Sequence, residues 1–333
     1  MTAELLVSIV TPSLNQGRFL EETLRSVLEQ EYPSVEHLAF DGGSTDGSVE
    51  ILERYAPRLA YWTSGPDAGQ ADAINRGWAR AQGAIVAYLN SDDCYLPGAI
   101  RRAVDYLEEH PDVGIVYGAC QVVDAQGRPL GGSREPADGS LAHLLRYPLP
   151  QPTMFARRWV LDRIGLLDAR YHCTMDWNWT IRAAMAGIPL SRMPGPPLAR
   201  VRVWEGAKTS TLFRQCVDES LRFREELLTE LAAGSSLAAQ VRESRAWVCL
   251  WPAYELYVRG RTAEARGLLH RAFRLDPAIA ASGAFAGLYA RTWLGPSGSR
   301  AARRIKAELI AMPWLRAINR GAHQTSGWRL ESR

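Results

Sequence analysis

Two adjacent carboxylates stand where an apolar run of the sequence ends. Asp92 and Asp93 close the segment Asn90-Ser91-Asp92-Asp93, which directly follows the apolar residues 85–89. Carboxylate oxygens suit hard divalent cations, and Mg²⁺ is commonly held by one or two carboxylates together with substrate phosphates. A diphosphate leaving group needs such a cation to neutralise the charge that develops on it. The alternative is helix capping, because Asp is a frequent capping residue and Leu96-Pro97-Gly98 follows.

Two further polar clusters follow apolar runs in the same way. Asn15 and Gln16 come soon after the run 5–10, and the segment 41–46, Asp-Gly-Gly-Ser-Thr-Asp, follows the run 37–40. The glycines permit close approach of the backbone to a flat or charged ligand. Asp41 can accept hydrogen bonds from a base or a ribose. The segment is too short for a Walker loop and lacks the GxGxxG spacing, so dinucleotide binding is not expected.

Alternating strands and helices are expected to position these clusters. The apolar runs 5–10, 37–40, 59–63 and 85–89 predict strands, and helical spacing of apolar residues predicts helices over 19–28, 49–55 and 71–81. This alternation predicts an α/β fold with a mostly parallel sheet flanked by helices. Ligands of such sheets bind beyond the carboxyl ends of the strands. All three polar clusters are therefore expected on one rim, which favours cation binding over capping for Asp92 and Asp93.

The alternation of predicted strands and helices becomes less regular after residue 120. Gly, Pro and charged residues over 127–139 predict a surface hairpin or mobile loop, while 159–166 and 175–186 predict helices and 198–204 a closing strand. From about residue 212 onward the sequence is expected to be almost entirely helical. We therefore predict two domains, 1–213 with the sheet and 214–333 as a helical C-terminal region.

Composition narrows the class of protein. The 333 residues are 47% hydrophobic, and no run approaches the roughly 18 apolar residues of a membrane span. The N-terminus lacks the features of a secretory signal, and the five cysteines are scattered, so a reduced, cytoplasmic protein is expected. Residues 1–213 carry a net charge of −5 and residues 214–333 one of +8. The basic part is either a solvated helical face or a surface for peripheral association with the inner, anionic face of the cytoplasmic membrane.

Six motifs in order resemble those of family 2 glycosyltransferases. They are Val7-Ser-Ile-Val-Thr-Pro-Ser-Leu-Asn-Gln, Asp41-Gly-Gly-Ser-Thr-Asp, Asp67-Ala-Gly-Gln-Ala-Asp-Ala-Ile-Asn, Leu89-Asn-Ser-Asp-Asp, Pro150-Gln-Pro-Thr and Met175-Asp-Trp-Asn-Trp. The resemblance covers about residues 5–210. It implies a GT-A (Rossmann-like) fold, an inverting mechanism, a divalent cation (Mg²⁺ or Mn²⁺) and a nucleoside-diphosphate sugar, with a UDP-sugar as the expected donor. The implied acceptor is a saccharide or a lipid-linked saccharide, and no nucleic-acid partner is expected.

The resemblance also implies roles for single residues. Asp93 would be the principal metal ligand, and Asp92 would lie by the ribose or the metal. Asp176 matches the family's catalytic base, which removes the proton of the acceptor hydroxyl as its oxygen attacks the anomeric carbon. The other expected donor-binding residues line the base pocket, contact the base or form the floor beneath the nucleotide: Thr11, Pro12, Asn15, Asp41, Gly69, Asp72 and Asn75. Asn75 is expected to make structural hydrogen bonds, and Trp177 and Trp179 either stack on sugars or belong to the core.

The sequence departs from the family at two positions. Asn178 stands where relatives often have a second acid, and Trp204 stands where they often have a metal-ligating histidine. An indole cannot ligate, so Asp93, diphosphate and water would hold the cation, with help from Glu205. Lys208 or Arg202 would neutralise the diphosphate. Reduced activity or an altered metal preference would follow.

We expect an inverting glycosyltransferase of surface polysaccharide or glycolipid synthesis. A sugar-1-phosphate nucleotidyltransferase would need a glycine-rich loop with a basic residue directly after the first strand, and residues 11–16 provide neither. The alternative from another class is a catalytically weak nucleotide-sugar-binding protein in which the basic helical tail acts as a scaffold.

Overall fold

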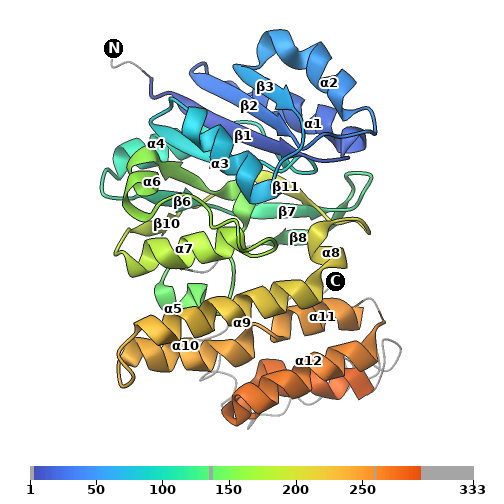
Figure 1. Cartoon of the computed structure of the whole chain (residues 1–333), viewed down its shortest axis with the longest axis vertical. Helices are drawn as coiled ribbons and strands as arrows, with labels where there is room; N and C mark the ends of the chain where they lie inside the picture. The colour runs from blue at the N-terminus through green and yellow to red at the C-terminus, as the bar shows by residue number, and fades with distance from the viewer. Residues whose placement is uncertain (1–3, 135–137, 259, 294–333) are drawn as a thin grey trace. The chain divides into compact units, whose positions relative to one another are not determined.

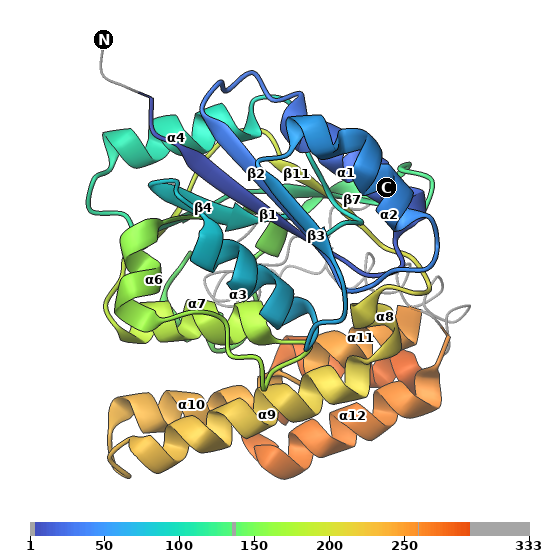
Figure 2. The same cartoon turned by 45° about the horizontal axis from the view of Figure 1, so that its top comes forward.

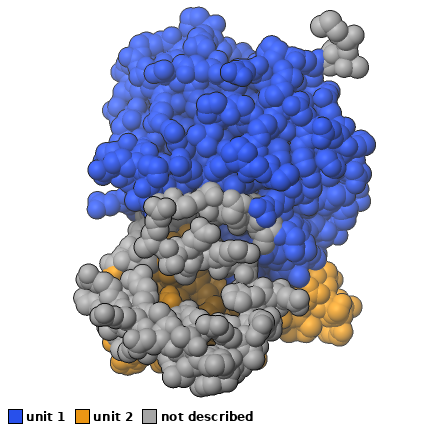
Figure 3. Space-filling view, turned by 180° about the vertical axis from the view of Figure 1, so that it is seen from behind, with its two compact units in different colours: residues 1–212 blue, residues 213–333 orange. Residues whose placement is uncertain are grey.

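The computed structural model describes residues 4–134, 138–258 and 260–293 of the chain (Figure 1). The chain divides into two compact units, residues 1–212 and 213–333, which are coloured separately in Figure 3. Within the described residues, no helix has the length and apolar character that crossing a membrane requires.

A seven-stranded sheet forms the centre of the first unit, with the strand order β10-β6-β9-β4-β1-β2-β3. Strands β4, β1, β2 and β3 run parallel and side by side (Figure 2). Only β9 pairs antiparallel with its neighbours β4 and β6. The predicted mostly parallel sheet is therefore confirmed. The strand bounds are β1 Val7–Ser13, β2 Val35–Asp41, β3 Tyr61–Ser64, β4 Ile85–Tyr88, β6 Ile115–Tyr117, β9 Phe155–Arg157 and β10 Leu190–Arg192.

Helices cover both faces of this sheet. Leu20 and Leu24 of α1 pack with Leu52 of α2 against one face. Helix α3 packs on the other face so closely that a Cβ atom at Gly77 would lie 2.4 Å from Val10 Cγ1, which makes glycine necessary there. The helices of the unit are α1 Gly17–Leu28, α2 Ser48–Tyr55, α3 Gln70–Arg80, α4 Ala99–Glu109, α5 Leu141–Leu144, α6 Arg158–Ile164, α7 Met175–Met185 and α8 Lys208–Thr211, with short 3₁₀ turns η1 Ala56–Arg58 and η2 Gln151–Thr153.

A second, four-stranded sheet has the order β5-β11-β7-β8. Its strands are β5 Cys94–Tyr95, β7 Cys120–Val123, β8 Pro129–Arg134 and β11 Ala199–Arg202. Strands β7 and β8 form an antiparallel hairpin, which confirms the hairpin alternative for residues 127–134. Residues 135–137 of the expected hairpin lie outside the described residues. Strand β11 pairs parallel with β7 and antiparallel with β5, the strand that follows Asp93. This sheet thus brings residues near 200 beside residues near 94.

The described part of the second unit is helical, as the sequence predicts. Its elements are α9 Phe213–Glu230, α10 Ser236–Trp247, α11 Leu250–Val258, α12 Thr262–Leu275 and the 3₁₀ turn η3 Pro277–Ala281. Buried apolar side chains such as Leu227, Val241, Leu256 and Leu269 form its core. The expected helical character of residues 294–333 lies outside the described residues.

Candidate active site

The polar clusters after β1, β2 and β4 lie at one edge of the sheet. Ser13 at the end of β1 is in register with Asp41 at the end of β2, and Leu89 after β4 donates its N–H to the Val10 carbonyl at 2.9 Å. Hydrogen bonds join the clusters. Asn15 donates its backbone N–H to Ser44 Oγ at 2.7 Å, and its Oδ1 accepts a hydrogen bond from the Thr45 backbone at 2.9 Å. Asn15 itself adopts the left-handed backbone conformation (φ 51°), which Asn tolerates better than most residues. The predicted shared rim is therefore present.

Asp41 organises its own loop. Oδ2 accepts hydrogen bonds from the backbone N–H groups of Gly43 and Ser44 and from Ser64 Oγ, and Oδ1 accepts one from Ser44 Oγ at 2.5 Å. The residue is 2% exposed. The protein therefore donates to both oxygens, and the expected contact between Asp41 and a base stays a prediction.

The side chain of Thr11, one of the two residues expected to line a base pocket, lies in the interior of the protein. Its side chain has no exposed surface, and its hydroxyl bonds His37 Nε2 at 2.9 Å. Pro12 is buried as well. Burial lowers the pKa of His37 to about 3, so the imidazole is neutral and the pair is a structural contact between β1 and β2. Whether Thr11 and Pro12 line a base pocket stays a prediction, which these contacts do not test.

The loop of Asp92 and Asp93 places the two carboxylates differently. Asp93 is buried, and its Oδ1 accepts a hydrogen bond from the backbone N–H of Arg202 at 3.0 Å. Asp92 is less buried, and its Oδ2 accepts a hydrogen bond from Trp204 Nε1 at 2.9 Å. Burial raises the pKa of both groups, that of Asp93 well above its usual range with a further contribution from the charge of Asp92. Two adjacent carboxylates in such a place are a donor set that suits a hard divalent cation.

Trp204 is anchored over the start of α1. Its ring lies 5.3 Å from that of Phe19, and the guanidinium of Arg18 lies 4.0 Å from its centroid. A Cβ atom at Gly206 would lie 2.1 Å from the indole, so only glycine leaves room for this ring position. Trp204, which stands where the resemblance implies a histidine, thus contacts Asp92, one of the two predicted cation ligands.

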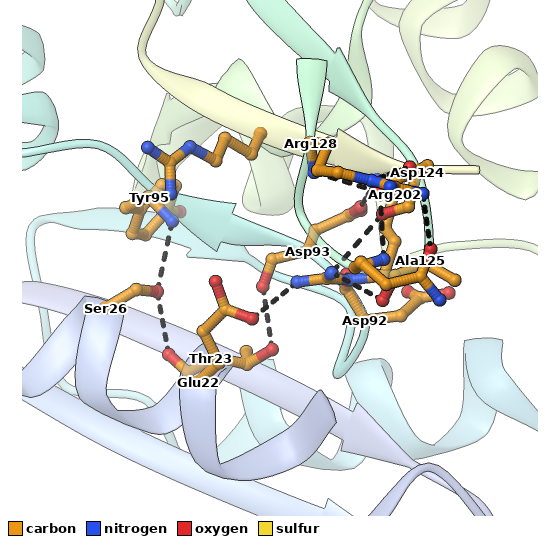
Figure 4. Close-up of polar contacts among 12 residues, drawn as sticks. Glu22, Thr23, Ser26, Asp92, Asp93, Tyr95, Asp124, Ala125, Arg128 and Arg202 are labelled. Carbon is orange, nitrogen blue, oxygen red and sulfur yellow. Dashed lines mark hydrogen bonds and ion pairs between the residues drawn. The ribbon is translucent and has the colours of Figure 1, made fainter. Parts of the chain in front are cut away.

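Arg202 cannot neutralise a diphosphate as expected, because the protein occupies its guanidinium. Nη2 donates to Glu22 Oε2 at 2.6 Å and Nε donates to the Asp92 carbonyl at 3.0 Å (Figure 4). The Arg202 side chain is 3% exposed. Lys208, which is only partly buried, keeps this role as a prediction, and Glu205 is exposed and stays a predicted ligand that no contact tests.

The segment 67–75 folds into the start of α3. Asp67 Oδ1 accepts a hydrogen bond from the Gly69 backbone at 2.8 Å, and Gly69 adopts φ 105°, where a Cβ atom would lie 3.3 Å from His172 Cε1. Asp72 Oδ2 accepts one from the Ala68 backbone at 3.3 Å. Asn75 exchanges two hydrogen bonds with the backbone of Leu167, at 2.8 and 3.0 Å. Asn75 therefore makes the structural contacts expected of it, and the donor contacts of Gly69 and Asp72 stay predictions.

A chain of amide side chains crosses the rim, and the sequence did not reveal it. Lys208 Nζ donates to Gln70 Oε1 at 2.5 Å, and Gln70 Nε2 donates to Asn90 Oδ1 at 2.6 Å. Asn90 Nδ2 donates to Gln151 Oε1 at 3.2 Å, and Gln151 Nε2 donates to the Tyr88 carbonyl at 2.8 Å. Gln70 and Gln151 both belong to motifs noted above, but each bonds Asn90 rather than the other. The chain forms only when Asn90 meets Gln151, which lies 61 residues later in the sequence.

Asp176 lies at the start of α7, near both Lys208 and Tyr88. Its Oδ1 accepts a hydrogen bond from the Trp177 backbone at 2.8 Å. Burial raises the pKa of Asp176, while the Lys208 charge opposes this shift. Burial and then the charges of Asp176 and Asp93 raise the pKa of Tyr88 well above its usual range, so the charges of both acids act on the Tyr88 hydroxyl.

The tryptophans flanking Asp176 are held by the protein. Trp177 Nε1 donates to the Leu144 carbonyl at 2.5 Å, and Trp179 Nε1 donates to the Gly165 carbonyl at 3.0 Å. Asn178 Oδ1 accepts a hydrogen bond from Arg182 Nε at 2.9 Å. These contacts favour the core alternative for both tryptophans.

The chain is similar in sequence to known glycosyltransferases. Residues 8–165 match the family described as Glycosyl transferase family 2. The chain is 32% identical over 197 residues to an uncharacterized glycosyltransferase of Mycobacterium tuberculosis, covering 57% of this chain and 73% of that protein. It is 31% identical over 182 residues to a PGL/p-HBAD biosynthesis glycosyltransferase of Mycobacterium bovis, covering 53% of this chain and 69% of that protein.

A solved structure shares the fold. The mannosyltransferase PcManGT from Pyrobaculum calidifontis, in complex with GDP-Man and Mn²⁺, is similar with a TM-score of 0.57 and 19% identity. The similarity covers 87% of this chain and 85% of that one. The strand order and helical layers described above are thus those of a GT-A fold. On its sequence relatives and this fold, the chain belongs to glycosyl transferase family 2 and is a glycosyltransferase.

Proposed function

We propose that this chain transfers a sugar, with inversion, from a nucleoside-diphosphate sugar to a hydroxyl group of a saccharide or lipid-linked acceptor in surface polysaccharide or glycolipid synthesis. The observation that carries the proposal is the hydrogen-bond chain Lys208–Gln70–Asn90. It joins the carboxylate loop to Lys208, whose charge acts on Asp176. A candidate cation site and a candidate base therefore belong to one connected rim.

In this proposal Asp92 is the carboxylate that binds the cation. Asp93, which the sequence favoured, is more deeply buried and bonds the Arg202 backbone. A bound Mg²⁺ or Mn²⁺ would supply charge neutralisation for the departing diphosphate. Lys208, which already lies beside Gln70, would add a positive charge on the same side.

Asp176 is the proposed general base. Burial raises the pKa of Asp176, which makes it a stronger base than an exposed aspartate. In a single displacement, it would accept the proton of the acceptor hydroxyl while that oxygen bonds the anomeric carbon and the bond to the diphosphate breaks. The departing diphosphate keeps the electron pair of that bond.

A thermal-shift screen of UDP-sugars and GDP-sugars, with and without Mn²⁺, tests donor and cation together. A ligand of the native state raises the melting temperature by mass action. We expect a UDP-sugar to stabilise the protein only when Mn²⁺ or Mg²⁺ is present, and labelled donor to be transferred or slowly hydrolysed. Stabilisation that survives EDTA would overturn the cation role, and binding without turnover for any acceptor would favour the scaffold alternative.

We also propose that the basic second unit associates with an anionic membrane from the cytoplasmic side. The support is the net charge of +8 on residues 214–333. Sedimentation of the full chain with phosphatidylglycerol vesicles should weaken as salt rises. Reversing the exposed Arg242 and Arg274 to Glu should weaken it further, whereas the same change at Arg25 and Arg163 in the first unit should not. Equal loss from both pairs would reject a dedicated surface.

A further inference from the structure

Arg202, the last residue of strand β11, and Trp204, two residues beyond it, together donate three hydrogen bonds to Asp92 and Asp93. Strand β11 pairs antiparallel with β5, with Arg200 opposite Cys94, the residue that follows Asp93. Beyond the last backbone pair, Arg202 N–H donates to Asp93 Oδ1 at 3.0 Å and Arg202 Nε donates to the Asp92 carbonyl at 3.0 Å. Trp204 Nε1 donates to Asp92 Oδ2 at 2.9 Å. The carboxylate loop is thus held by this strand end.

The guanidinium of Arg202 joins three separate segments. Besides the Asp92 carbonyl, it donates to Glu22 Oε2 on α1 at 2.6 Å and, through Nη1, to the Ala125 carbonyl in the β7–β8 turn at 3.2 Å. It also lies 4.6 Å from the Phe19 ring centroid. A planar fork with five N–H donors can meet such divergent acceptors at once, which a single ammonium group cannot.

Helix α1 holds the same loop from its other end. Thr23 Oγ1 donates to the Asp93 carbonyl at 2.7 Å (Figure 4). Within the loop, Asp93 N–H donates to the Asn90 carbonyl at 3.0 Å. Consecutive carbonyls, those of Asp92 and Asp93, are therefore bonded by Arg202 and Thr23 respectively. With both carbonyls fixed, the backbone that carries the Asp92 side chain has little freedom to rotate.

We propose that Arg202 is a positioning residue for cation binding, through its hydrogen bond to the Asp92 carbonyl. It does not touch the donor, because the protein surrounds its guanidinium. It fixes the backbone from which the Asp92 carboxylate would bind the cation, and it links that backbone to α1 and the β7–β8 turn. Partners of this kind typically change metal affinity or activity 10- to 100-fold when they are removed. The inference rests on the proposed function of Asp92.

The test measures Mn²⁺ binding directly, by electron paramagnetic resonance of the full chain in the presence of UDP. We expect Arg202→Met to raise the apparent Kd for Mn²⁺ by about 10- to 100-fold. Arg202→Lys should give an intermediate Kd, since one ammonium cannot reach Glu22 and the Asp92 carbonyl together. Saturating Mn²⁺ should restore much of the turnover of both variants, which a purely structural defect would not allow.

Arg200→Met is the matched control. Arg200 lies on the same strand, and its Nε donates to Gln121 Oε1 at 3.3 Å. Its loss should leave the Kd for Mn²⁺ unchanged. Melting curves establish that each variant folds, and if Arg202→Met does not fold, Arg202→Lys decides. A wild-type Kd in the folded Arg202 variants overturns this inference alone, whereas wild-type protein that binds no Mn²⁺ with UDP overturns the proposed cation site and this inference with it.

Discussion

Trp204 donates its indole N–H to Asp92 Oδ2 across 2.9 Å, although the two residues are 112 positions apart in the sequence. The side chain at position 204 therefore already reaches the carboxylate that we propose as the cation ligand. An imidazole at this position would present a ring nitrogen to the same region, and imidazole ligates divalent transition metals well. The indole instead donates its single N–H to the carboxylate.

Trp204→His should tighten Mn²⁺ binding. We expect at least a several-fold lower apparent Kd for Mn²⁺ in the presence of UDP, because a second protein ligand is added, and less change for Mg²⁺, which prefers oxygen. The same resonance titration measures it. Trp204→Phe is the control, since it keeps an aromatic ring against Phe19 but cannot ligate. Equal Kd values for the His and Phe variants would show that position 204 does not face the cation.

Asp92→Asn and Asp93→Asn should behave differently. Asp92→Asn removes the proposed ligand charge, so we expect Mn²⁺-dependent stabilisation by UDP to disappear. Asp93→Asn keeps an oxygen to accept from the Arg202 backbone and removes a buried charge, so its melting temperature without ligand should match or exceed that of the wild type. Calorimetric or fluorescence melting curves check both. Loss of Mn²⁺ dependence only in Asp93→Asn would restore Asp93 as the ligand.

Asp176→Asn should abolish turnover without abolishing donor binding. General-base help is typically worth about 10²- to 10⁴-fold, and the amide cannot accept the hydroxyl proton. We expect kcat to fall in this range while the donor still raises the melting temperature as in the wild type. Asn178→Ala, two positions further along the same helix, is the control that tests whether any disturbance of α7 has the same effect. A variant Asp176→Asn that keeps wild-type kcat would exclude Asp176 as the base.

Lys208→Met should shift the acid limb of the pH–rate profile to higher pH. Burial raises the pKa of Asp176, and the positive charge of Lys208 counteracts part of that rise. The base acts in its deprotonated form, so activity falls as pH drops through its pKa. Without the Lys208 charge the pKa rises further, and the loss of activity begins at a higher pH. Profiles of kcat/KM for both proteins measure it, and an unchanged acid limb would show that Lys208 does not act on the base.

The sheet and its rim were predictable because their signals are local. The run 85–89 is apolar throughout, as is typical of a strand that is covered on both faces, and the polar residue Asn90 follows it directly. Strand β9 was not predicted, since three residues carry no periodicity of their own. Strand β11 falls within the predicted strand 198–204, but its pairing with β5 and β7 could not be predicted from the sequence. Their pairings join segments that lie far apart in the chain.

The site was predictable as a set of residues and less so as a set of contacts. Thr11 belongs to a motif, but a fully buried strand gives no sign of which side chains reach the surface. Asp41 accepts one of its hydrogen bonds from Ser64, 23 residues later in the sequence. Arg202 donates one of its hydrogen bonds to Glu22, 180 residues earlier. Residue types indicate which chemistry is available, whereas tertiary partners decide which lone pairs and protons remain for a substrate.

Strand β11 also has a consequence for the order in which the protein is made. Arg202, Trp204 and Lys208 complete a rim whose other members are present once residue 176 has been synthesised. At roughly 5–20 residues per second, the carboxylate loop exists for several seconds before its strand partner is made. A nascent chain halted before residue 202 would hold two neighbouring carboxylates without the donors that restrain them. Competence to hold a cation should therefore arise late in translation, as the last step in the maturation of the first unit.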